Sequence, residues 1–89
     1  MNEADREKLV VSCACLFLFH TAEMRPPNRL PSVKEYQRHE TARERALYQM
    51  AKALGWENLS IDGQLTLPQW NAAIQHISQM QKEGNLPNV

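Results

Sequence analysis

The sequence has few of the residues that loop-rich or disulfide-stabilised folds require. Three glycines among 89 residues are too few for a β-fold with many tight turns. The two cysteines, Cys13 and Cys15, lie two positions apart, so on a helix they point in nearly opposite directions and cannot form a disulfide. We expect reduced thiols packed in the core of a cytoplasmic protein.

Net charge and long hydrophobic runs are also lacking. Ten basic and ten acidic residues cancel, so the whole molecule has no electrostatic attraction to nucleic acid or to an anionic membrane. The apolar segment 9–19 has about half of the ~20 residues that a membrane-spanning helix needs. It follows acidic residues rather than the basic start of a secretory signal. We therefore predict a protein that binds no membrane.

No catalytic motif is recognisable. The sequence shows no nucleophile beside a base, no paired carboxylates and no glycine-rich phosphate loop. The three histidines, His20, His39 and His76, lack the spacing of metal ligands. We therefore predict a protein that is not an enzyme and needs no cofactor.

The residues that are present predict an all-α fold. Apolar residues make up 43% of the chain, and a chain of this length supports one core. We predict a single domain, residues 1–89, that forms a small three- or four-helix bundle, with a short hairpin-like turn at 61–65 between the last two helices. The predicted helices span 4–24, 33–54 and 67–83, followed by a frayed tail at 85–89.

Proline, glycine and capping residues set these helix boundaries. Pro26 and Pro27 end the first helix because proline removes a backbone donor and forces extended backbone. The segments Ser32–Glu35 and Thr66–Gln69 have the pattern of a capping box, which begins a helix. Gly55 and Gly84 suit the left-handed residue that follows a helix.

The first helix is apolar on every side between residues 9 and 19. Its β-branched and aromatic residues would also suit a strand, but no hairpin partner follows, so helix is favoured. A helix that is hydrophobic all round is normally enclosed by its neighbours or by another chain. A homo-oligomer is therefore one alternative that the sequence leaves open.

The loop from Asn58 to Gln69 resembles the calcium-binding loop of EF-hand proteins, and with its flanking helices the resemblance covers residues 48–79. Gly63 stands at the turn position of that family. The resemblance implies a helix-loop-helix with a cation held by Asn58, Ser60, Asp62, Gln64, Thr66 and Gln69.

Asp62 is the only carboxylate in this loop, whereas EF-hands hold calcium chiefly by carboxylates. We therefore predict no metal site and interpret the segment as an Asp-Gly turn and a capping box that join two helices. A degenerate EF-hand-like metal-binding module remains an alternative function.

The second helix carries a line of basic residues that we call the basic ridge: Lys34, Arg38, Arg45 and Lys52. At 100° per residue these side chains project within about 40° of one another. Thr41 and Tyr48 lie beside them, opposite the apolar face, and Trp56 follows the helix as an exposed aromatic residue. The predicted partner-binding residues are Lys34, Arg38, Thr41, Arg45, Tyr48, Lys52 and Trp56.

His39 and Arg43 interrupt the apolar face of the same helix. They could pair with an acidic partner or cap the end of the first helix. We expect them to pack at the edge of the bundle.

These observations favour a protein-binding module that acts as a small accessory, regulatory or inhibitor protein, of the kind that phages and mobile elements encode. It would occlude or bridge a larger protein with an acidic surface. Nucleic-acid binding through the basic ridge is an alternative, although the last helix carries no arginine for reading the major groove. An ordinary solvated face is the other interpretation of the ridge.

Overall fold

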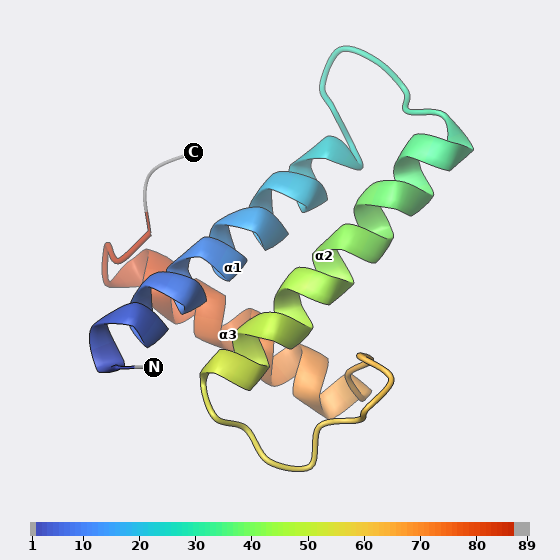
Figure 1. Cartoon of the computed structure of the whole chain (residues 1–89). Helices are drawn as coiled ribbons and strands as arrows, with labels where there is room; N and C mark the ends of the chain where they lie inside the picture. The colour runs from blue at the N-terminus through green and yellow to red at the C-terminus, as the bar shows by residue number, and fades with distance from the viewer. Residues whose placement is uncertain (1, 87–89) are drawn as a thin grey trace.

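Three helices make up the fold in the computed structural model, which describes residues 2–86. The helices are α1 (Glu3–Glu23), α2 (Val33–Ala53) and α3 (Leu67–Lys82). The helices α1 and α2 lie side by side and antiparallel, and α3 crosses them near the start of α1 and the end of α2 (Figure 1). Residues 2–86 contain no strand. The predicted all-α bundle is confirmed in its three-helix form.

The core lies where α2 packs against both other helices. Leu47 and Met50 of α2 have no exposed surface, and Ala14 of α1 and Ala73 of α3 are as completely buried. The small side chains of these alanines let the helix backbones approach closely. The remaining buried core residues are Val10, Cys13, Phe17, Ala46, Ile77, Met80 and Leu86.

Trp70, near the start of α3, joins the third helix to the other two. Its indole meets the ring of Phe17 edge to face, with the ring centroids 5.9 Å apart. Arg43 approaches the same indole from α2, and its guanidinium lies 5.4 Å from the ring centroid. Arg43 therefore packs at the edge of the bundle, as predicted.

Side chains and glycines cap the helices largely as the sequence indicates. The Thr66 hydroxyl accepts from the Gln69 amide at 3.3 Å, and the Gln69 side chain accepts from the Thr66 amide at 2.9 Å, which confirms this capping box. Gly55 has φ 83°, and the next amide, of Trp56, donates to the Ala51 carbonyl at 3.1 Å. Left-handed backbone of this kind, which glycine adopts readily, ends the helix.

The structure differs from the sequence prediction at the start of α2 and at the C-terminal tail. Ser32 accepts from the Glu35 amide, but the Glu35 carboxylate binds Arg29 at 2.8 Å, so the predicted capping box at α2 is only half formed. The predicted frayed tail is wrong for its first part, because Leu86 packs in the core and the Asn85 amide donates to the Met80 carbonyl. Residues 87–89 of that tail lie outside the described residues.

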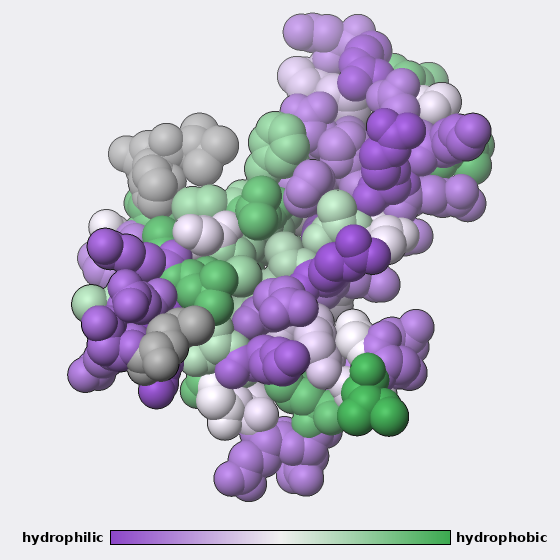
Figure 2. Space-filling view, viewed as in Figure 1, coloured by the Kyte–Doolittle hydropathy of each residue, from purple (hydrophilic) through white to green (hydrophobic). Residues whose placement is uncertain are grey.

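Along one side of α1, apolar side chains remain in solvent. Leu9, Leu16 and Phe19 are 37%, 49% and 48% exposed, because two neighbouring helices cannot surround the third. Figure 2 shows apolar surface gathering over α1 on the face in view. The homo-oligomer that would cover it stays a prediction.

The other end of the α1–α2 pair extends beyond α3 (Figure 1). There the Nδ1 atoms of His20 and His39 lie 2.9 Å apart, and the ring of Phe19 packs edge-on against both imidazoles. A hydrogen bond between two Nδ1 atoms needs one ring to donate and the other to be neutral and accept. This bond therefore cannot persist when both rings are protonated.

Acidification is expected to destabilise the fold through this pair. Burial and the nearby His39 lower the pKa of His20, against an opposing effect of Glu23. The unfolded chain then binds protons more readily, so the free energy of unfolding falls as the pH drops below about 6.5. Denaturant unfolding at pH 7 and pH 5 should show this loss, and His20→Gln should reduce it. The control His76→Gln should behave as the wild type, and an undiminished loss in His20→Gln would contradict the interpretation.

Truncating a buried side chain at the centre of α2 should lower the free energy of unfolding more than truncating an exposed one. Leu47→Ala leaves a cavity between three helices, and we expect a loss of about 2–5 kcal/mol in the free energy of unfolding. Leu67→Ala is the matched control, because Leu67 is 72% exposed, and its effect should stay within about 0.5 kcal/mol. Equal losses in guanidinium titrations would refute this assignment of the core.

Candidate functional site

The basic ridge lies on the outer face of α2. Lys34, Arg38, Arg45 and Lys52 are all exposed, and Thr41 is exposed between them. The ion pair within residues 2–86 joins Arg29 to Glu35, so no described carboxylate forms a salt bridge with a ridge residue. The positive charges of the ridge are thus available to a partner, and the binding role of the ridge stays a prediction.

One hollow, of about 420 Å³, lies between the C-terminal half of the ridge and the α2–α3 loop. Arg45 and Lys52 line it from α2, and Ile61, Asp62 and Gln64 line it from the loop. The ridge and the EF-hand-like loop are separate features in the sequence. The fold brings them together around this hollow.

Tyr48 lies on the ridge side of α2 but is not on the open surface, and its role as a contact residue stays a prediction. Its side chain is buried, and its hydroxyl donates to the Ser60 carbonyl. The periodicity of α2 does place Tyr48 on the ridge side, but the loop folds back over that position. Tyr48 therefore fixes the loop against α2 at the floor of the hollow.

Trp56 is not the exposed aromatic residue that the sequence predicts. It is half-buried and packs against the hydrophobic core. The left-handed Gly55 turns the chain back, and the residue after such a glycine commonly contacts the end of its own helix. Trp56 therefore contributes part of its side chain to the core, and its role as a contact residue stays a prediction.

Ile61 is an exposed residue that the sequence prediction did not include. It stands in the turn closed by the Ser60 carbonyl and the Gly63 amide, and its side chain is fully exposed beside the hollow. Because this turn projects into solvent, the Ile61 side chain is too far from the core to be buried there. The isoleucine directly before Asp-Gly is the pattern that could have indicated it.

The loop that resembles an EF-hand uses its polar side chains within itself. The Asp62 carboxylate accepts from the Ser60 hydroxyl and from the Gln64 amide, and these hydrogen bonds lower the pKa of Asp62. Gln69 caps α3 and donates to the Asn58 carbonyl at 3.4 Å. In the part of the chain that is described, no three His, Cys, Asp or Glu side chains are placed to hold a metal ion.

Calcium is accordingly expected to leave the protein unchanged. Trp56 and Trp70 lie on either side of the loop, so their fluorescence should respond if the loop closed around a cation. A titration to millimolar calcium should give a flat signal, with magnesium as the control for ionic strength. A saturable change with calcium alone would support the EF-hand-like alternative.

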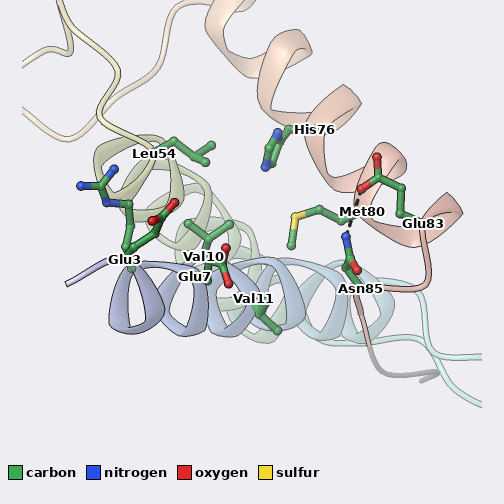
Figure 3. Close-up of a pocket in the computed structure, with 10 residues that line it drawn as sticks. Glu3, Glu7, Val10, Val11, Leu54, His76, Met80, Glu83 and Asn85 are labelled. Carbon is green, nitrogen blue, oxygen red and sulfur yellow. Dashed lines mark hydrogen bonds between the residues drawn. The ribbon is translucent and has the colours of Figure 1, made fainter. Parts of the chain in front are cut away.

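A second concave surface lies between the start of α1 and the end of α3, with a volume of about 500 Å³. Figure 3 shows Glu3 and Glu7 on α1 beside Val10 and Val11, and Glu83 across the groove on α3. We call it the α1–α3 groove, and its other lining residues are Arg6, Leu54, His76, Met80 and Asn85. No pattern in the sequence indicates it, because the groove depends on how α3 crosses α1.

Similarity to known proteins gives no further assignment. No protein-family model, no curated protein and no solved structure matches this chain. None of the helices within residues 2–86 combines the length and the apolar character needed to cross a lipid bilayer.

Proposed function

We propose that this protein is a non-enzymatic, cytoplasmic protein-binding module that uses the hollow beside α2 to dock a larger protein with an acidic surface. The observation that carries the proposal is the placement of the fully exposed Ile61 next to Arg45 and Lys52. The protein would act as an accessory or inhibitor by occluding or bridging its target.

The chemistry of this surface suits a protein partner. Interface centres combine an apolar contact with arginine, and a surrounding polar rim excludes water. Ile61 offers the apolar contact, while Arg45 and Lys52 offer charge-assisted hydrogen bonds to carboxylates. The bond from Tyr48 to Ser60 holds the loop in place before binding, which lowers the entropic cost of association.

An acidic protein fits the hollow better than a nucleic acid does. Glu44 and Asp62 line the same hollow and would repel a phosphate backbone, and an exposed isoleucine gains little from phosphate. A protein with both carboxylates and an apolar side chain can avoid the two acids and cover Ile61. We therefore place nucleic-acid binding second.

Selection from a displayed peptide library tests the proposal without knowledge of the natural partner. Peptides enriched on the immobilised protein should combine Asp or Glu with a bulky apolar residue. Their affinity should fall at least about tenfold for the double variant Arg45→Glu and Lys52→Glu, and severalfold for Ile61→Ser. Anisotropy titrations of labelled peptides would measure both effects.

The matched control reverses two exposed bases away from the hollow, Lys8→Glu on α1 and Arg25→Glu in the loop after it, and so makes the same change in net charge. These variants should keep the affinity within about twofold. An equal loss in the control, or selected peptides without acidic residues, would refute the proposal. Duplex DNA binding that is weakened steeply by salt and by Arg38→Glu with Arg45→Glu would favour the nucleic-acid alternative.

A further inference from the structure

We infer that the α1–α3 groove is a second docking site, which accepts a basic amphipathic helical segment of a partner protein. This site lies on different elements from the hollow beside α2 and does not depend on the function proposed for that hollow.

The base of the groove is apolar. Val10 and Met80 form its base, and the half-buried Val11 and Leu54 contribute from α1 and from the end of α2. Figure 3 shows Val10, Met80 and Leu54 directed toward the same space from α1, α3 and the end of α2. An apolar side chain placed there would lose contact with water on several sides, which is favourable.

The charges around this apolar base are predominantly negative. Glu3, Glu7 and Glu83 line the groove against Arg6 and His76, and no ion pair within residues 2–86 involves any of the five. Glu83 has its carboxylate oriented by the side chains of Gln79 at 2.8 Å and Asn85 at 3.0 Å. Lysine or arginine side chains of a partner would therefore find unneutralised carboxylates on both sides of the groove.

The helix dipole accounts for only one of these carboxylates. Glu3 stands in the first turn of α1, where a negative charge favours the helix dipole, but Glu7 lies beyond that turn. Glu83 stands at the C-terminal end of α3, where a negative charge opposes the dipole. Glu83 accepts from Gln79 one turn earlier on its own helix, whereas a cationic partner would give Glu7 an attraction that the dipole does not supply.

The length of the groove suits a short helix. Its α1 wall runs from Glu3 to Val11, which corresponds to about 12 Å of helix at 1.5 Å per residue. Two turns of a partner helix match this length and present apolar residues three and four positions apart on one face. Lysine or arginine at the edges of that face would reach the carboxylates.

The test uses a synthetic 14-residue helical peptide of leucine and lysine with amphipathic spacing, and its twin with glutamate in place of lysine. Fluorescence anisotropy should show binding of the lysine peptide and at least tenfold weaker binding of the glutamate peptide. The double variant Glu3→Gln and Glu7→Gln should weaken the lysine peptide at least fivefold, and Val11→Ser should weaken it as well.

The matched control is Glu40→Gln with Glu57→Gln, which removes two carboxylates that line neither the α1–α3 groove nor the hollow beside α2. It should leave the affinity within about twofold. Equal weakening in the control would show diffuse charge attraction and would overturn the inference. Sedimentation that shows the protein associating with itself through the Glu3 and Glu7 face would also overturn it, because the occupant would then be a second copy.

Discussion

The structure depends on the burial of Leu47 and Met50, which α1, α2 and α3 together remove completely from water. Because these residues fix the inner face of α2, the same helix must present Arg38, Arg45 and Lys52 to solvent. The end of α2 at Gly55 then directs the loop back over Tyr48. The position of the hollow thus follows from the core rather than from any feature of the loop alone.

Because the core is small and apolar, the charged side chains lie on the surface. No charged residue is buried within residues 2–86. The hollow beside α2 is lined by two bases and two acids, whereas acids outnumber bases around the α1–α3 groove. The hollow beside α2 combines Arg45 and Lys52 with an apolar contact, whereas the α1–α3 groove combines an apolar base with Glu3 and Glu7. A protein with two such surfaces on different elements is suited to bridging two partners, or two parts of one partner.

Local patterns in the sequence predicted the helices well, because caps and glycines act within a few residues. The Thr66 and Gln69 capping box and the left-handed Gly55 are of this kind. The burial of Tyr48 and Trp56 was not predicted, because it depends on where the loop returns, which helical periodicity does not contain. The groove carboxylates escaped prediction for the same reason, since the groove forms only where α3 crosses α1.

The most direct measurement for the central claim, that partners dock at the hollow beside α2, is chemical-shift mapping of the ¹⁵N-labelled protein with a selected acidic peptide. The account predicts shifts concentrated at Arg45, Lys52 and residues 61–64, with the amides of α1 unchanged. Shifts confined to α1, or spread evenly over the whole chain, would contradict it.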